Sequence, residues 1–417
     1  MSNLKELIQQ YCPDGVEYRP IWSLTAWDKK FNGIDKSKQK KVIKYNYLLA
    51  ADLKSYQVEG GTVKLLTTNI SNLYTTEELA EELASDGEVV AIPWGGNPIV
   101  QYYKGRFLTA DNRIATSLDT TLLNNKFLYY CMLSKMDTIA SFYRGSGIKH
   151  PEMAKVLDLE IPVPPLPVQE EIVRILDNFA ELQAELQAEL QKRLQQYNYY
   201  RDKLLTFNDL NGGGYAVSVE WKKLGEIATL IRGGNFQKKD FTDSGVPCIH
   251  YGQIYTHFGI HTTSTLKYIS PEVASKSKIA KTNDIVMAIT SENVEDVGKC
   301  VAWLGEEDIA VSGHTAIIQH KQNAKYLSYY FHTSHFFTQK KKLAHGTKVI
   351  EISPKDLANV IIPIPSLEEQ QRIVDILDRF NILTNDITAG LPAEIEARRK
   401  QYEYYRDKLL TFKQKAS

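Results

Sequence analysis

The chain has 417 residues, which is enough for about two to four domains of ordinary size. Lys and Arg together number 50, as do Asp and Glu, so the formal net charge is zero. This balance excludes a uniformly basic nucleic-acid coat protein and a protein with a long acidic tail, but a locally basic DNA-binding face remains compatible with it because net charge averages over domains.

The beginning of the chain is polar and lacks the apolar segment of a signal peptide. Nowhere does the sequence approach the ~20 consecutive apolar residues that a membrane-spanning helix requires. The cysteines, Cys12, Cys131, Cys248 and Cys300, are far apart and form no metal-binding or redox-active CxxC pair. Scattered thiols are typical of a reducing compartment. We therefore expect a soluble cytoplasmic protein that makes no membrane contact.

Residues of about 15–160 form a first region with mixed strand and turn signals. The run Gly87–Ile92 is typical of a short buried strand, and Lys126–Tyr130 opens a predicted helix. An Ile-Pro-Val-Pro linker at residues 161–164 ends the region. We interpret the region as one compact α/β module.

Basic, amide and aromatic residues gather in the predicted loops of this module. Glycines in the runs Trp94–Asn97 and Arg144–Lys149 would let the backbone approach a ligand closely. Lys and Arg bind phosphates, and Asn, Gln and Arg read base edges. A lysine run such as the one in residues 36–44 is also typical of a solvated face. The DNA-binding candidates of the first module are Lys38, Lys40, Lys41, Asn97, Arg144, Ser146 and Lys149.

A long amphipathic helix is predicted to follow the linker. Pro167 suits its first turn. The apolar residues at helical spacing are Val168, Ile172, Ile175, Leu176 and Phe179. The pattern predicts a helix of about 40 residues and ~60 Å, which is longer than a single globular core.

The middle of this helix is an Ala-Glu-Leu-Gln tetrapeptide that occurs three times in succession, at residues 180–191. All four residue types favour helix. One unit adds about 6 Å and turns the apolar stripe by about 40°. The array is typical of a coiled-coil strut, and a sharper hypothesis makes its length a ruler between two modules.

Residues of about 215–361 form a second mixed region. Asp284–Ile289 is a predicted buried strand, and Lys325–Tyr330 opens a predicted helix. His250, His257 and His261 have a loose metal-like spacing, but no cysteine or carboxylate pattern accompanies them, so we predict polar contacts and no metal. The DNA-binding candidates of this module are Arg232, Asn235, Lys238, Lys239, Tyr251, Gln253, Thr347 and Lys348.

The helical segment that begins at residue 362 repeats the first one. Gln196–Phe207 returns as Gln401–Phe412 with eleven of twelve residues identical. Both helical segments follow an Ile-Pro-x-Pro linker, and the second copy carries four additional residues between Phe380 and Tyr402. The chain is therefore two copies of one unit, each a mixed module followed by a helical segment.

The start of the second helix has a capping-box pattern, with Ser366 as N-cap and Glu369 at the third helical position. We expect this helix also to run for about 40 residues, with a kink at Gly390 and Pro392. Two long helices that each carry an apolar stripe are predicted to pack on each other.

The near-identical twelve-residue segment has two interpretations. It is either the packed end of each helix or a docking surface that is used twice, in which case two similar surfaces would bind two copies of one partner. The partner-binding candidates are Tyr197, Tyr200, Arg201, Lys203, Tyr402, Tyr405, Arg406 and Lys408.

Sequence motifs of catalysis are missing. There is no phosphate-binding P-loop, no nucleophile elbow and no metalloprotease helix. We also find no glycine-rich S-adenosylmethionine loop and no nuclease cluster of carboxylates with lysine. The sequence predicts that this chain by itself is not an enzyme.

The duplicated blocks resemble the specificity subunit of Type I restriction–modification enzymes, over essentially the full chain. These blocks are Ile-Pro-x-Pro, the pair Gln169–Val173 and Glu369–Val374, and Gln-Tyr-x-Tyr-Tyr-Arg-Asp-Lys-Leu-Leu. The resemblance implies an α+β fold with two α/β target recognition domains, separated by two long antiparallel helices and related by a pseudo-twofold repeat. The implied parts are a first recognition domain (1–160), a central spacer helix (161–212), a second recognition domain (213–361) and a C-terminal spacer helix (362–417).

The resemblance also implies a function in prokaryotic phage defence. Each recognition domain would read one half of a bipartite DNA site, and the helices would set the gap and bind two modification (methyltransferase) subunits. Restriction (motor nuclease) subunits would complete an adenine-N6 DNA methyltransferase and ATP-dependent endonuclease. S-adenosylmethionine, ATP and Mg would be bound by these partner subunits, and this chain would hold no cofactor.

Two other classes of protein remain open. A scaffold without DNA recognition would bind only proteins through its paired modules, independently of salt. A self-sufficient DNA methyltransferase would bind S-adenosylmethionine as an isolated chain, which the missing motifs argue against.

Overall fold

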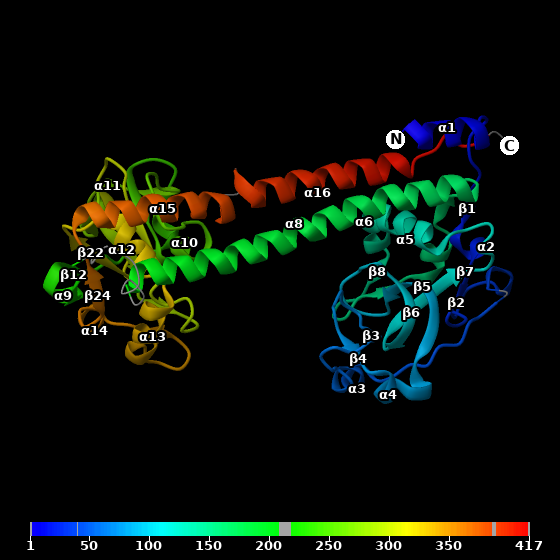
Figure 1. Cartoon of the computed structure of the whole chain (residues 1–417), viewed down its shortest axis with the longest axis horizontal. Coiled ribbons are helices and arrows are strands. Elements are labelled where there is room, and N and C mark those ends of the chain that lie inside the picture. Colours follow the sequence, from blue (N-terminus) through cyan, green and yellow to red (C-terminus); the bar gives the residue numbers. More distant parts are fainter. Residues whose placement is uncertain (1, 40, 208–217, 386–388, 416–417) are drawn as a thin grey trace. The chain divides into compact units, whose positions relative to one another are not determined.

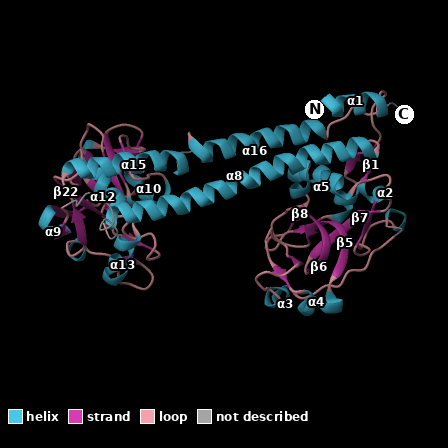
Figure 2. Cartoon of the chain, in the orientation of Figure 1, coloured by secondary structure: helices cyan, strands magenta, loops and turns pink. Residues whose placement is uncertain are grey.

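The computed structural model describes residues 2–39, 41–207, 218–385 and 389–415 (Figure 1). The chain divides into two compact units, one of Met1–Glu185 with Ile395–Ser417 and one of Leu186–Glu394. Within each unit the strands gather together beside helices (Figure 2). Helix α8 (Leu166–Thr206) begins in the first unit and ends in the second.

The first unit is built on a six-stranded mixed sheet with the order β2-β7-β5-β6-β3-β4. A short antiparallel pair, β1 with β10, lies at the entry to α8, and β8 pairs with β9. The strands are β1 (Tyr18–Pro20), β2 (Thr25–Trp27), β3 (Val63–Leu66), β4 (Tyr74–Thr75), β5 (Ser85–Pro93), β6 (Gln101–Thr109), β7 (Asn112–Ser117), β8 (Tyr143–Arg144), β9 (His150–Pro151) and β10 (Glu160–Pro162). The helices are α1 (Ser2–Tyr11), α2 (Ile21–Leu24), η1 (Lys36–Lys38), α3 (Ala50–Ser55), α4 (Glu77–Ala80), η2 (Glu81–Leu83), α5 (Asn125–Ser134), α6 (Met136–Ser141) and α7 (Met153–Leu157).

The second unit contains two five-stranded sheets, β12-β22-β18-β20-β15 and β13-β16-β14-β21-β17, and the pairs β11-β24 and β19-β23. Its strands are β11 (Glu220–Lys223), β12 (Ala228–Arg232), β13 (Phe241–Thr242), β14 (Val246–Ile249), β15 (His261–Thr262), β16 (Lys267–Ile269), β17 (Lys278–Ala280), β18 (Ile285–Ala288), β19 (Thr290–Ser291), β20 (Cys300–Trp303), β21 (Ile309–Val311), β22 (Thr315–His320), β23 (Ile350–Glu351) and β24 (Ile361–Ile364). Its shorter helices are α9 (Leu224–Ile227), η4 (Lys238–Asp240), α10 (Tyr251–Thr256), α11 (Pro271–Ser275), α12 (Ala324–Tyr330), α13 (Ser334–Leu343) and α14 (Pro354–Leu357). These elements confirm the predicted α+β class, and mixed sheets occur in both units.

The internal repeat is visible in the strand pairing. Tyr18 lies opposite Pro162 in the first unit, and Trp221 lies opposite Pro363 in the second. The two copies therefore enter their long helices through equivalent antiparallel pairs, as the internal repeat predicts.

The predicted caps agree with the observed helix starts. Helix α8 begins at Leu166, so Pro167 lies in its first turn, where a missing N–H costs nothing. Helix α15 (Leu367–Asn385) begins directly after Ser366, whose hydroxyl accepts a hydrogen bond from the Glu369 N–H at 3.3 Å. The 41 residues of α8 match the expected length.

The expected second helix of about 40 residues is wrong in one respect, because it is divided. Helix α15 ends at Asn385 and α16 (Gly390–Leu409) begins after it. Gly390 has φ +75°, a left-handed conformation that favours glycine and ends regular helix, and Pro392 is tolerated in the first turn of α16. The four additional residues of the second copy also fall between its two shared blocks, so a division there accommodates the extra length.

One pair of stacked aromatic rings joins the long helices within each unit. In the first unit Phe179 of α8 stacks on Tyr405 of α16, with ring centroids 5.6 Å apart. In the second unit Tyr200 of α8 stacks on Phe380 of α15 at 6.0 Å. Phe179 and Phe380 are equivalent in the repeat, as are Tyr200 and Tyr405. These are the contacts that two antiparallel, repeated helices make.

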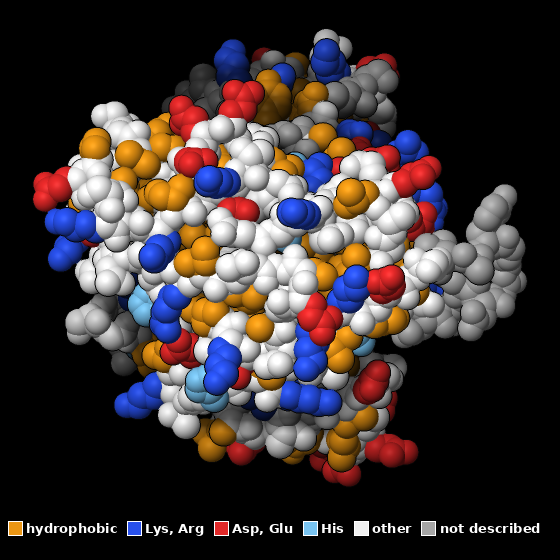
Figure 3. All heavy atoms as spheres, turned by 90° about the vertical axis from the view of Figure 1, so that its left-hand side faces the viewer, with side chains coloured by type: hydrophobic (Ala, Val, Ile, Leu, Met, Phe, Trp, Pro, Cys, Tyr) orange, Lys and Arg blue, Asp and Glu red, His pale blue; other side chains and the backbone are white. Residues whose placement is uncertain are grey.

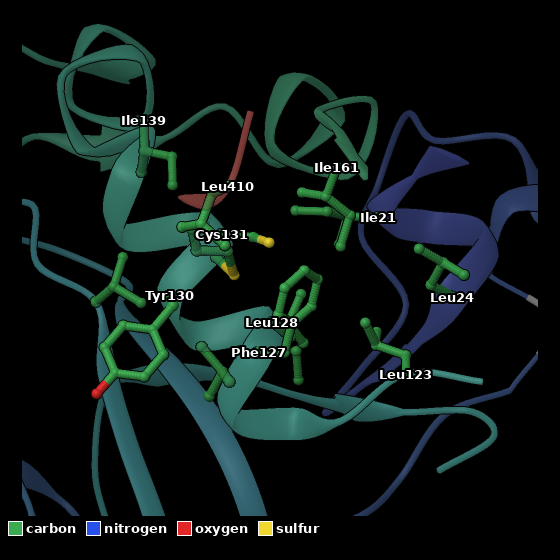
Figure 4. Close-up of a cluster of buried hydrophobic side chains, with 14 of the residues drawn as sticks. Ile21, Leu24, Leu123, Phe127, Leu128, Tyr130, Cys131, Ile139, Ile161 and Leu410 are labelled. Atoms are coloured by element: carbon green, nitrogen blue, oxygen red, sulfur yellow. The ribbon is translucent and has the colours of Figure 1, made fainter. Parts of the chain in front are cut away.

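The repeated twelve-residue segment packs into the core of a module in each copy. Tyr197, Leu204, Leu205 and Phe207 join the core of the second unit, and the equivalent Tyr402, Leu409, Leu410 and Phe412 join that of the first. Leu205 is fully buried, and Leu410 lies among α5 side chains such as Phe127 and Cys131 (Figure 4). Each helix end therefore completes the hydrophobic core of one unit.

Candidate nucleic-acid interface and partner surface

Two loops of the first unit meet beyond the buried end of β5. The loop after β5 contains Trp94, whose carbonyl oxygen lies 2.7 Å from His150 Nδ1 on β9. The Trp94 and His150 rings are 5.1 Å apart. The β8–β9 hairpin carries Ser146 and Lys149, which are exposed together with Asn97. The fold thus brings both predicted loops of this module to one place.

A buried ion pair supports these loops from below. The Arg113 guanidinium lies 4.4 Å from the Trp94 ring centroid and 3.4 Å from Asp28, and both charged side chains are buried. Burial raises the pKa of Asp28 above its ordinary value, while the Ile114 N–H and the charge of Arg113 oppose that rise. Lys29 also lies over Trp94, at 5.3 Å. Two cations therefore contact the Trp94 indole through cation–π interactions.

The second unit assembles the equivalent loops. Strand β19 pairs with β23, so the loop after β18 meets the 345–351 loop, which carries Thr347 and Lys348 on its exposed side. Arg232 forms an ion pair with Glu351 at 3.0 Å and donates a hydrogen bond to the Gly313 carbonyl at 3.3 Å.

An open cavity of about 400 Å³ lies beside these loops. Tyr251 lines it together with His314, and their ring centroids are 5.0 Å apart. His314 Nδ1 lies 3.0 Å from the Thr290 hydroxyl, and Asn293 and Asp296 also line the cavity. The cavity offers hydrogen-bonding groups of the kind that read base edges and aromatic rings of the kind on which bases stack.

Some candidate side chains are used internally. The Gln253 side chain accepts a hydrogen bond from the His250 N–H at 2.8 Å, which caps α10. Burial lowers the pKa of His250 to about 4, so its neutral ring can also accept a hydrogen bond from the Gly252 N–H. Lys38 pairs with Asp158 at 2.5 Å, and Arg144 pairs with Glu152 at 3.1 Å.

The remaining candidates are solvent-facing. Lys41, Asn235, Lys238 and Lys239 are exposed, and Lys40 lies outside the described residues. Figure 3 shows one face of the second unit, where Lys and Arg side chains are interspersed with acidic and hydrophobic ones. The basic groups on this face do not form a separate patch, in keeping with the balanced composition.

The partner-binding candidates divide by burial. Tyr197 is 5% exposed and Tyr402 is half-buried, so both pack inward. Arg201 and Arg406 pair with the adjacent Asp202 and Asp407, at 2.7 and 2.8 Å. Tyr405 is also half-buried, whereas Tyr200, Lys203 and Lys408 are exposed.

Two exposed aromatic residues are missing from the sequence candidates. Tyr199 is 58% exposed and Tyr404 is 60% exposed, and they are equivalent in the repeat. The ammonium groups of Lys203 and Lys408 lie 5.9 and 5.5 Å from their rings. The spacing of four residues places each pair on one helix face, away from Tyr197 and Tyr402, and could have identified it from sequence.

No described helix has the combination of length and apolarity that a membrane crossing demands. In the described ranges, no three His, Cys, Asp or Glu side chains are close enough to hold a metal ion. All four cysteines are buried free thiols.

Comparison with known proteins gives one consistent result. The family model of the Type I restriction modification DNA specificity domain matches the chain twice, at residues 29–196 and 217–397. A Type I restriction enzyme specificity subunit of Escherichia coli is 36% identical over 317 residues, which cover 72% of this chain and 74% of that protein. A putative Type I specificity subunit of Haemophilus influenzae is 33% identical over 354 residues, covering 81% and 86%.

Two solved structures share the fold. The specificity subunit of a Type I restriction–modification system from M. genitalium aligns with a TM-score of 0.53 at 15% identity, over 95% of this chain and 96% of that one. A chain from a structure of an assembled type I R-M system aligns with a TM-score of 0.55 at 17% identity, over 95% and 98%.

Proposed function

The chain belongs to the family of Type I restriction–modification DNA specificity subunits, and on this premise we propose that it reads a bipartite DNA site. As a specificity subunit it provides DNA recognition for a Type I restriction–modification system. In the proposal, recognition domain 1–160 reads one half-site and recognition domain 213–361 reads the other. The spacer segments 161–212 and 362–417 fix the gap between them.

The observation that carries this proposal is the repetition of the loop pair. Each unit joins the loop after a buried strand to a basic hairpin loop, at Trp94 and His150 in the first unit and at Thr290 and Glu351 in the second. Apart from Gly145 and Gly346, which are the same in both hairpin loops, most residues there differ between the copies. Two domains that recognise different base sequences need a similar backbone arrangement with different side chains.

The proposed partners follow from the repeat and the family. Two modification subunits would dock on the two exposed Tyr–Lys pairs, Tyr199 with Lys203 and Tyr404 with Lys408. Restriction subunits would join that assembly in the prokaryotic cytoplasm. S-adenosylmethionine, ATP and Mg would be bound by those partners, and this chain would contribute no catalytic group.

A salt titration tests the DNA-binding part of the proposal. We expect the affinity of the complex with its modification subunits for mixed-sequence duplex to fall steeply between 50 and 200 mM salt. The variants Lys149→Ala and Lys348→Ala each remove one proposed phosphate contact, so each lowers the slope of log affinity against log salt by about one.

Lys104→Ala is the matched control, because Lys104 lies on β6 and its side chain is 70% exposed. The slope of log affinity against log salt for this variant is expected to equal that of the wild-type complex. Equal DNA binding with and without this chain would instead favour a protein-binding scaffold.

A further inference from the structure

Each recognition domain is attached to its long helix by an aspartate at the equivalent position of the repeat. In the first unit Asp177 of α8 accepts hydrogen bonds from the Lys126 ammonium at 2.8 Å and the Tyr130 hydroxyl at 2.6 Å. Both donors lie on α5, one helical turn apart. We call this arrangement of one Asp with one Lys and one Tyr the clamp.

The second unit contains an equivalent clamp. Asp378 of α15 accepts from Lys325 at 2.8 Å and from the Tyr329 hydroxyl at 2.7 Å, and both donors lie on α12. The corresponding distances in the two clamps agree within 0.1 Å. The loops around the two DNA-reading surfaces differ between the copies, but this attachment does not.

A buried glutamine makes a second attachment two helical turns away. Gln169 of α8 accepts from the Asn124 N–H at 2.9 Å and donates to the Pro164 carbonyl at 2.7 Å. Gln370 of α15 accepts from the Asn323 N–H at 3.0 Å and donates to the Pro365 carbonyl at 2.9 Å. Asn124 and Asn323 are the N-caps of α5 and α12. Each of these two helices is therefore held at its start and again about one turn further on.

These polar contacts do what the surrounding apolar contacts cannot. Buried side chains such as Phe127 with Ile172, and Leu327 with Ile373, belong to the same hydrophobic clusters and hold the helices together. Apolar contact is non-directional, so it tolerates sliding or rotation of one helix over another. A carboxylate that accepts from two donors one turn apart is satisfied in a single register.

We propose that Asp177 and Asp378 are positioning residues, which fix the orientation of each recognition domain about its spacer helix and so determine which gap between half-sites the complex accepts. The inference rests on the proposed function, because it assigns the gap to the domain attachments as well as to helix length. Neither clamp lies in a DNA-reading loop, so the half-site sequences are independent of it.

The test compares methylation of duplexes that carry both half-sites at the natural gap or at gaps one base pair shorter and longer, by the complex with modification subunits. Asp177→Ala is expected to lower the preference for the natural gap about tenfold, and Asp378→Ala does the same. The half-site bases stay unchanged. Glu185→Ala, at an exposed position of the same helix, is the matched control and keeps the full preference.

A structural role alone would have another signature. A lower unfolding temperature of Asp177→Ala with an unaltered gap preference would overturn the proposal. If Asp177→Ala yields no folded complex, Tyr130→Phe keeps the buried ring and removes one hydrogen bond, and about a threefold loss of gap preference is expected. An unaltered preference in that variant would equally overturn the clamp.

The same experiment separates the clamp from the function on which it rests. Absence of any gap preference in the wild-type complex would overturn the proposed function together with the clamp. A strong gap preference in the wild-type complex that persists in the Asp177→Ala and Asp378→Ala variants would overturn the clamp alone.

Discussion

Deleting one Ala-Glu-Leu-Gln unit from α8, residues 184–187, is expected to shorten the gap between the half-sites by about one to two base pairs. Four helical residues span about 6 Å, compared with ~3.4 Å per base pair of duplex. The array residues are exposed or half-buried, with Leu182 36% exposed, so the deletion removes length without removing a core. Methylation of duplexes with systematically varied gaps measures the change.

Replacing residues 184–187 by four alanines is the matched control, because it keeps the helix length and should keep the gap. The half-site bases should be unchanged in both variants, since no DNA-reading loop is altered. Efficient methylation of the original gap by the deletion variant would contradict the ruler.

The substitutions Leu205→Ala and Leu410→Ala are expected to destabilise different units. Each leucine is buried at an equivalent position of the repeated segment, Leu205 in the core of the second unit and Leu410 in that of the first. A buried Leu→Ala change costs about 2–5 kcal/mol, through lost burial and the cavity left behind. Amide hydrogen exchange read separately over the two units measures where protection is lost.

Leu182→Ala provides the control, because its side chain is partly exposed on the same helix. We expect it to change protection in neither core. Equal loss of protection in both units on Leu205→Ala would show that the segment does not serve one core at a time.

The helices and strands were predicted well from the sequence because they depend on local signals. Predicted strand Gly87–Ile92 lies within β5, and the predicted helix start at Lys126 lies in the first turn of α5. The cap at Ser366 depends on residues adjacent in the chain. The division between α15 and α16 was predicted only as a kink, because a sequence pattern does not fix how much a left-handed glycine and four additional residues interrupt a helix.

The site was less predictable because it depends on contacts between distant residues. Sequence spacing placed Asn97 and Lys149 in loops, but not the buried pair of Arg113 and Asp28 beneath Trp94. Likewise, each Asp clamp joins residues about 50 positions apart, and neither segment by itself shows that the two meet. The dual role of the repeated segment, with Tyr197 inside and Tyr199 outside, follows from helical periodicity only when the packed face is known.

Genome-wide single-molecule mapping of N6-methyladenine tests most directly whether this chain reads a bipartite site. The cells compared express the cognate modification subunit with or without this chain. We expect a single methylated motif of two short fixed blocks with a constant gap, present only when the chain is present. Identical methylation in both cells, with expression of both proteins verified, would contradict DNA recognition by this subunit.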